Sequence, residues 1–119
     1  MSDEARLAVY TKGVEIGQQV IDEIVRRILG ASNPRRVILF GSAATGRMTR
    51  DSDIDLLIVE DSPGDTGDRS LDFYGALKGI GHPVEVIVMA TERFEETKNV
   101  IGGIAFPANK YGKVIYESC

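Results

Sequence analysis

With 119 residues, the chain is long enough for one domain with a modest hydrophobic core. Its apolar fraction of 43% and charged fraction of 27% are ordinary for a globular protein, and no apolar run is long enough to span a membrane. The net charge of −4 argues against broad binding to nucleic acid, although a locally basic phosphate site remains compatible with it.

The first predicted element is an amphipathic helix that ends near residue 30. Apolar residues recur at four-residue spacing from Ile16 through Val20 to Ile24. Gly30 is the expected C-cap, because the following Asn-Pro pair prevents continuation of the helix.

Two short apolar runs then predict two buried strands. The first covers Arg36–Phe40 and the second covers Ile54–Val59, and their unbroken apolar character is typical of strands covered on both faces. Between them, Ser42 is expected to cap a short helix that reaches about Gly46. After the second strand, residues 60–69 are rich in Asp, Gly, Ser and Pro, which indicates a mobile surface loop.

The remainder of the chain predicts two helices and two strands. A helix over Asp68–Lys78 is expected to turn Leu71, Leu77 and either Tyr74 or Gly75 inward. The third strand is expected over Val84–Met89.

Thr91 then resembles the N-cap of a helix that fades near Gly102 and Gly103. Residues 105–110 are expected to form a connection that leads to a last strand over Lys113–Tyr116. We see no internal repeat and expect one domain over residues 1–119. The only cysteine is Cys119, so no intrachain disulfide can form, and a start without the layout of a signal peptide favours the cytoplasm.

Two aspartates stand where the second predicted strand begins. Asp53 and Asp55 are two residues apart, so on a strand their carboxylates point to the same face. Their mutual repulsion does not help folding, but a bound divalent cation would offset it. Carboxylate oxygens are hard ligands of the kind that Mg²⁺ prefers. The alternative is that both are only turn and strand-entry residues.

A third acid, Glu85, interrupts the apolar third strand. A buried unpaired carboxylate is costly or becomes neutral. If the second and third strands are neighbours, Glu85 could face Asp53 and Asp55, and the three acids would form a platform for two metal ions. The alternative is that Glu85 is an exposed residue of an edge strand.

The Gly41-Ser42 pair indicates a phosphate site. Gly41 would allow a phosphate to approach the backbone, and Ser42 at a helix start would offer a hydroxyl and amide hydrogens. Arg47 and Arg50 could neutralise phosphate charge, although they could equally be solvated surface charges. Because no Gly-Lys-Ser/Thr follows, this is not a Walker-type ATPase loop. A metal-bound nucleoside triphosphate fits the whole set.

These residues together resemble the nucleotidyltransferase superfamily with the polymerase-beta fold, and in particular its minimal nucleotidyltransferase branch. The resemblance rests on Gly41-Ser42, the ten residues that follow, Asp53-Ile54-Asp55, and the later acid Glu85. It implies an α/β fold with a short mixed sheet flanked by helices, two Mg²⁺ ions held by Asp53, Asp55 and Glu85, and ATP as the substrate. One departure is that the third acid of this family is commonly aspartate.

The resemblance also implies a partner. Minimal nucleotidyltransferases are commonly paired with a small helical HEPN-domain protein, often as antitoxin and toxin, and in characterised pairs AMP is transferred to a tyrosine of that partner. The expected reaction is therefore Mg²⁺-dependent transfer of AMP to a hydroxyl group. Because the chain shows no extra domain to hold an acceptor, a HEPN-type protein or a second copy of this chain is expected to supply that surface. Two alternatives stay open: a small-molecule nucleotidyltransferase, acting for example on an aminoglycoside-like alcohol, and a non-catalytic subunit that inhibits its partner by contact.

Overall fold

Four strands and five helices make up the part of the chain that the computed structural model describes, residues 17–46 and 52–118. No helix in this part is both long and apolar enough to cross a membrane. In chain order the elements are α2 (Gln18–Ala31), β1 (Arg36–Phe40), α3 (Ser42–Thr45), β2 (Ile54–Glu60), α4 (Thr66–Ala76), β3 (Val84–Ala90), α5 (Thr91–Thr97), α6 (Ala105–Tyr111) and β4 (Lys113–Glu117).

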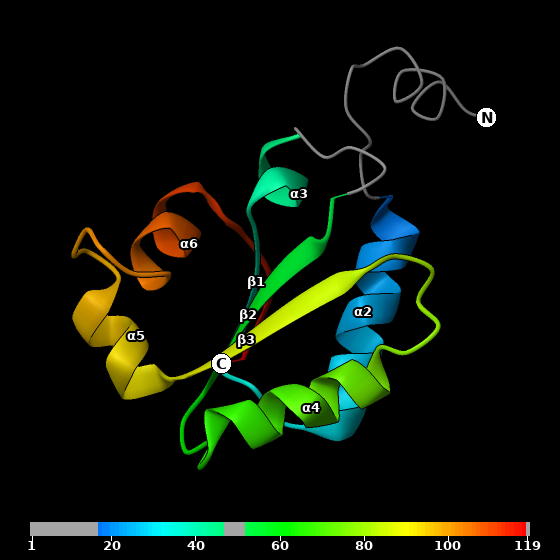
Figure 1. Ribbon diagram of the computed structural model, residues 1–119, viewed down its shortest axis with the longest axis horizontal. Helices are drawn as coiled ribbons and strands as arrows, with labels where there is room; N and C mark the ends of the chain where they lie inside the picture. Colours follow the sequence, from blue (N-terminus) through cyan, green and yellow to red (C-terminus); the bar gives the residue numbers. More distant parts are fainter. Residues whose placement is uncertain (1–16, 47–51, 119) are drawn as a thin grey trace.

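The strands form one mixed sheet with the order β3-β2-β1-β4. β2 and β3 are parallel, whereas β1 is antiparallel to both β2 and β4. The helices α2 and α4 cover one face of the sheet, and α5 and α6 lie against the other (Figure 1). The predicted fold class, an α/β fold with a short mixed sheet flanked by helices, is therefore confirmed.

The central strand β2 is apolar on both faces because helices cover both. Leu56 and Ile58 point into the cluster that α2 and α4 complete, while Leu57 and Val59 point into the cluster completed by α5 and α6. None of these four side chains is more than 2% exposed. Full burial of one such side chain contributes about 1.5–3 kcal/mol, so β2 is the main source of hydrophobic stabilisation in the sheet.

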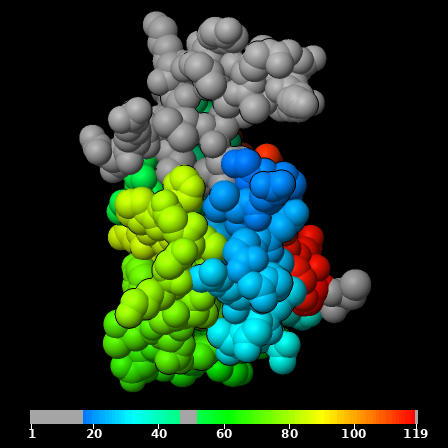
Figure 2. Space-filling model, turned by 90° about the vertical axis from the view of Figure 1, so that its right-hand side faces the viewer, coloured from blue at the N-terminus to red at the C-terminus, as the bar shows by residue number. Residues whose placement is uncertain are grey.

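On the first face, α2 and α4 lie side by side (Figure 2). Ile24 and Ile28 are the buried centre of α2, and Phe73 and Leu77 hold the same place at α4. In α2 the buried residues recur every three or four positions, as the sequence pattern predicts.

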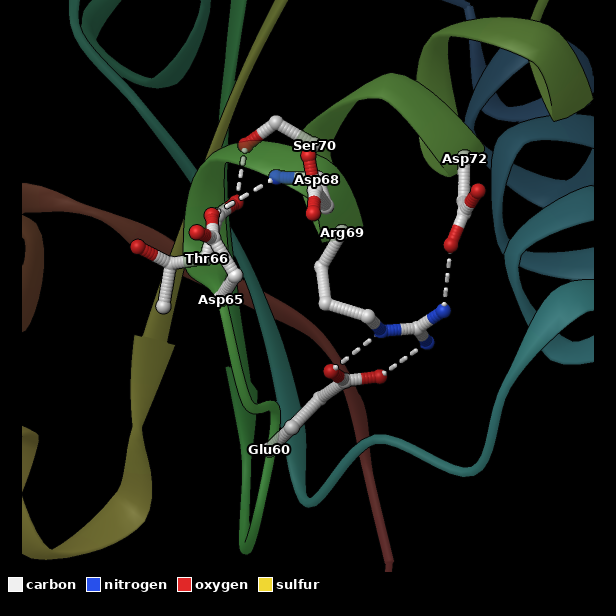
Figure 3. Close-up of polar contacts among 7 residues, drawn as sticks. All are labelled: Glu60, Asp65, Thr66, Asp68, Arg69, Ser70 and Asp72. Atoms are coloured by element: carbon white, nitrogen blue, oxygen red, sulfur yellow. Dashed lines mark hydrogen bonds and ion pairs between the residues drawn. The ribbon is translucent and has the colours of Figure 1, made fainter.

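An ion pair fixes the start of α4 to the end of β2 (Figure 3). The Glu60 side chain is 9% exposed and accepts two hydrogen bonds from Arg69, from Nε at 3.0 Å and from Nη2 at 2.7 Å. Nη1 of Arg69 also donates to Asp72 at 2.8 Å. The hydrogen bonds from Arg69 hold the pKa of Glu60 below its usual value. One turn earlier, Asp65 caps α4 by accepting from the backbone N–H of Asp68.

The outer edge of β3 is partly closed by a side chain of α4. The hydroxyl of Tyr74 accepts a hydrogen bond from the backbone N–H of Val86 at 3.0 Å. Because β3 is an edge strand, this N–H would otherwise need water or another chain as its partner.

All four predicted strands are present and begin at the predicted residues, while the last three extend one residue beyond the prediction. The predicted C-cap of the first helix was wrong: Gly30 lies inside α2, and Ser32 is the cap residue. The predicted loop over residues 60–69 is shorter, because Glu60 ends β2 and α4 begins at Thr66.

The helix predicted over Asp68–Lys78 is present two residues earlier, as α4, but its predicted inward face was partly wrong. Leu71 is 67% exposed, whereas Phe73 is completely buried. Residues two positions apart in a helix point in directions about 200° apart around the helix axis, so Leu71 and Phe73 cannot both face the sheet. Phe73 and the predicted Leu77, one turn apart, form the buried stripe instead.

Three further expectations about the last third of the chain were wrong. Thr91 is the first residue of α5 rather than its cap, and its hydroxyl donates to Asp61 at 2.8 Å. α5 ends at Thr97, before the predicted end. Residues 105–110 belong to the helix α6 rather than to a connection. Pro107 is compatible with this because it lies in the first turn, where backbone N–H groups have no partner within the helix.

Candidate active site at the strand ends

Most of the predicted site residues lie at one end of the sheet, where β1 ends and where β2 and β3 begin. The register places Phe40 of β1, Asp55 of β2 and Glu85 of β3 in one row across three strands. Gly41 directly follows β1, and Asp53 directly precedes β2. In Figure 1 this end of the sheet is next to α3. The condition under which Glu85 could lie near Asp53 and Asp55, that the second and third strands are neighbours, is thus met.

Asp55 and Glu85 point to the same face of the sheet. Asp55 shares its face with Leu57, which is two residues further along β2, and Glu85 shares its face with Ile87 of β3. Both apolar residues belong to the cluster formed with α5 and α6. Paired residues on neighbouring strands are only about 5 Å apart, so the two carboxylates are direct neighbours.

The surroundings of Asp55 raise the pKa of its carboxyl group. Burial raises the pKa of Asp55 to about 6, with further contributions from a hydrogen bond with Glu85, the negative charge of Glu85 and the charge of Asp53. Glu85 and Asp53 therefore both act electrostatically on Asp55. Asp55 is half-buried, while Asp53 and Glu85 are exposed.

The exposure of Glu85 also fits the alternative that it is an ordinary surface residue of an edge strand. β3 is an edge strand, and Glu85 is an exposed residue near its start. However, the register places it beside Asp55 rather than away from it. An exposed carboxylate at this position can be reached by a substrate.

Gly41 has a backbone conformation that favours glycine, with φ of 70° and ψ of −150°. It is the N-cap residue of α3, and no side chain caps this helix. Ser42 is the first residue of α3 rather than its cap, which corrects the prediction. Among described contacts, the hydroxyl of Thr45 lies 3.4 Å from the carbonyl oxygens of Gly41 and Ser42. Arg47 and Arg50 lie outside the described residues.

The donor chemistry of the site suits a divalent cation. Two carboxylates side by side, one of them with a raised pKa, repel each other, and a cation between them would relieve that repulsion. Among residues 17–46 and 52–118, no three His, Cys, Asp or Glu side chains are arranged as a formed metal site. The neighbouring pair Asp55 and Glu85 therefore fits a cation, and the three-acid platform with Asp53 stays a prediction.

A hollow of about 240 Å³ lies at the opposite end of the sheet and shares no residue with this site. Its two arginines are already paired: Arg35 with Asp61, and Arg36 with Glu117. We therefore do not assign the chemistry to it.

Sequence reasoning did not foresee the contact between Gly41 and Asp55. A Cβ built on Gly41 would lie 3.3 Å from Cγ of Asp55 and would overlap its Oδ2. Fourteen positions separate the two residues, so only the antiparallel pairing of β1 and β2 reveals their contact.

Comparisons with known proteins bear on the fold and the family of this chain. A comparison with curated proteins gave no match. Among solved structures, a candidate nucleotidyltransferase from Sulfolobus solfataricus superposes with a TM-score of 0.58 and 22% identity, over 83% of this chain and 78% of that one. A toxin–antitoxin structure with AMP-PNP also has a TM-score of 0.58, at 18% identity, over 82% of this chain and 73% of that one. A mutant of the toxin–antitoxin pair MntA-HpeT has a TM-score of 0.56, at 15% identity, with the same coverage.

These structural neighbours share the fold of this chain. The sequence itself matches the family described as "Nucleotidyltransferase domain" over residues 19–108, which includes the described site residues Gly41, Ser42, Asp53, Asp55 and Glu85. This chain therefore belongs to the nucleotidyltransferase domain family.

Proposed function

We propose that this chain transfers AMP from ATP to a hydroxyl group of a separate acceptor, with Mg²⁺ as cofactor. The observation that carries the proposal is the row of Asp55 and Glu85 beside the Gly41-Ser42 turn. Carboxylates for a cation and a turn for a phosphate are the two parts that nucleotidyl transfer needs. The cytoplasm is the proposed location of this activity.

Each residue has a proposed role. Asp53 and Asp55 would hold divalent cations, which when bound would offset the charge of the triphosphate and of the leaving pyrophosphate. Gly41 and Ser42 would bind the triphosphate through the backbone and the hydroxyl, and Arg47 and Arg50 would neutralise its charge.

Glu85 is the proposed general base. Its carboxylate would accept the proton of the acceptor hydroxyl while that oxygen forms a bond to the α-phosphorus and the bond to the β-phosphate breaks. The products are an AMP ester of the acceptor and pyrophosphate. The exposure of Glu85 supports this role, since a base must reach a group that arrives from outside.

The proposed acceptor is a tyrosine of a small helical HEPN-type partner. The support is the resemblance to the minimal branch and the toxin–antitoxin structures among the structural neighbours, one of which contains AMP-PNP. From the same resemblance we propose that each active site binds two Mg²⁺ ions.

The test is to mix this chain with a HEPN-type protein encoded beside it, add ATP and Mg²⁺, and measure the intact mass of the partner. A mass increase by AMP units supports the proposal. A stable complex without a mass increase would favour a binding subunit, and no complex at all would favour a small-molecule acceptor.

Variants of the acids then separate their roles. Asp53→Asn should abolish transfer in a folded protein, and Glu85→Gln should lose most activity while Glu85→Asp retains some, because aspartate keeps the charge but retracts it. Asp22→Asn, on the exposed side of α2, is the matched control and should keep full activity. Wild-type rates in Glu85→Gln would contradict the role of Glu85 as a base.

A further inference from the structure

Gly41 is in contact with a functional side chain as well as being at the end of a strand. The Cβ that any other residue would carry at this position would overlap Oδ2 of Asp55 and lie 3.5 Å from its Cβ. Asp55 is also next to Glu85 on its other side in the sheet, because β2 lies between β1 and β3. The Asp55 carboxylate is thus flanked by the backbone of Gly41 and by a second acid.

The close contact is not a general result of a positive φ. Among the described glycines with positive φ, five others would carry a Cβ with nothing within 4 Å: Gly46, Gly64, Gly79, Gly81 and Gly102. Only at Gly41, within this set, does the missing side chain leave room for a carboxylate.

From this contact we infer that Gly41 is a positioning residue for Asp55. Its lack of a side chain lets the carboxylate lie against the backbone at the end of β1, and the backbone in turn limits how far the carboxylate can rotate. Gly41 therefore positions the carboxylate of Asp55 on β2, in addition to any contact that it makes with phosphate. The importance of this for cation binding rests on the proposed function, whereas the contact itself does not.

The first test is a double-mutant cycle measured by thermal unfolding without any ligand. Gly41→Ala introduces both backbone strain, because φ is positive, and an overlap of its Cβ with the Asp55 carboxylate. In an Asp55→Ala background the carboxylate is absent, so only the backbone strain remains. We expect Gly41→Ala to lower Tm by about 5 °C more in the wild-type background than in the Asp55→Ala background. Equal effects in the two backgrounds would overturn the inference.

Gly46→Ala is the matched control. Gly46 also has a positive φ, of 74°, but open space around its Cβ, so its effect should be the same with and without Asp55→Ala. If Gly41→Ala alone does not fold, the double variant decides. Cooperative unfolding regained on adding Asp55→Ala supports the overlap, and a double variant that stays unfolded contradicts it.

The second test measures ATP binding by calorimetry with and without Mg²⁺. A displaced Asp55 should weaken the Mg²⁺-dependent part of binding beyond any loss of phosphate contact at Gly41, so we expect Gly41→Ala to reduce ATP affinity about 10–100-fold more with Mg²⁺ than without it. An equal loss in both conditions would show that Gly41 acts on the phosphates alone. If wild-type binding does not depend on Mg²⁺, the proposed function fails, while the stability cycle still decides the role of Gly41.

Discussion

Replacing Asp55 by asparagine should stabilise the protein in the absence of nucleotide and metal. The pKa of Asp55 is raised from 3.8 to about 6, which means that folding disfavours its ionised form. Each pKa unit corresponds to about 1.4 kcal/mol, so the upper limit of the effect is about 3 kcal/mol. Because Asp55 is only half-buried, solvent screening reduces this to about 1–2 kcal/mol, or a rise in Tm of about 5 °C.

The pH dependence gives this prediction a definite sign. A carboxyl group whose folded pKa is raised leaves stability unaffected below its unfolded pKa, and it destabilises the fold progressively as pH rises toward the folded pKa. The Asp55→Asn variant lacks this effect. The difference in unfolding free energy between variant and wild type should therefore be small near pH 4 and reach its full value above about pH 6.

Urea unfolding at a series of pH values between 4 and 8 is the assay, with Asp22→Asn as the control. Asp22 is exposed on α2, where it accepts a hydrogen bond from Gln18 that an asparagine can still accept. A decrease in the stability of Asp55→Asn at pH 7, or a gain that does not depend on pH, would refute the reasoning. Adding Mg²⁺ should reduce the difference in unfolding free energy between Asp55→Asn and the wild type, because only the wild type keeps the Asp55 carboxylate as a proposed ligand of the ion.

Three further substitutions test features of the fold. Glu60→Gln should lower the unfolding free energy by about 2 kcal/mol at pH 7, because Arg69 loses a nearly buried charged partner. Folding lowers the pKa of Glu60, so this loss should shrink as acid protonates the wild type; a constant difference down to pH 2 would contradict it. Tyr74→Phe should cost about 1 kcal/mol and speed hydrogen exchange at Val86, and unchanged exchange there would show that the hydroxyl is dispensable. Gly30→Ala should raise Tm, since glycine inside a helix is about 0.5–1 kcal/mol less stable than alanine, and a lower Tm would mean that Gly30 caps α2 after all.

The strands could be predicted from the sequence because each is an apolar run bounded by residues that interrupt regular structure. The orientation of α4 could not be predicted in the same way. Leu71, Phe73 and Leu77 are all apolar, and they define two different stripes around one helix. Only packing against β3 and α2 selects the stripe with Phe73. Similarly, Pro107 suggests an interruption in sequence, whereas its place in the first turn of α6 makes it harmless.

The acids of the site could be named from their spacing, but their arrangement depends on strand order. Asp53 and Asp55 are close in sequence, whereas Glu85 becomes a neighbour of Asp55 only because β3 lies next to β2 in a parallel register. The roles of Asp53, Asp55 and Glu85 remain predictions. The contact between Gly41 and Asp55 depends on the antiparallel pairing of β1 with β2 and on one side-chain position, and no pattern of residue types encodes it.

Near the start of β2, Asp55 is repelled by the neighbouring acids, whereas at the end of the strand Glu60 forms a stabilising ion pair with Arg69. Asp55 and Glu60 are five residues apart, which is about 16 Å along an extended strand. Energetic effects at such a separation usually add. During evolution, substitutions that remodel the acidic end can therefore be compensated at the Glu60 end without disturbing the reacting groups. The same independence gives an engineer a place to restore stability after altering the chemistry.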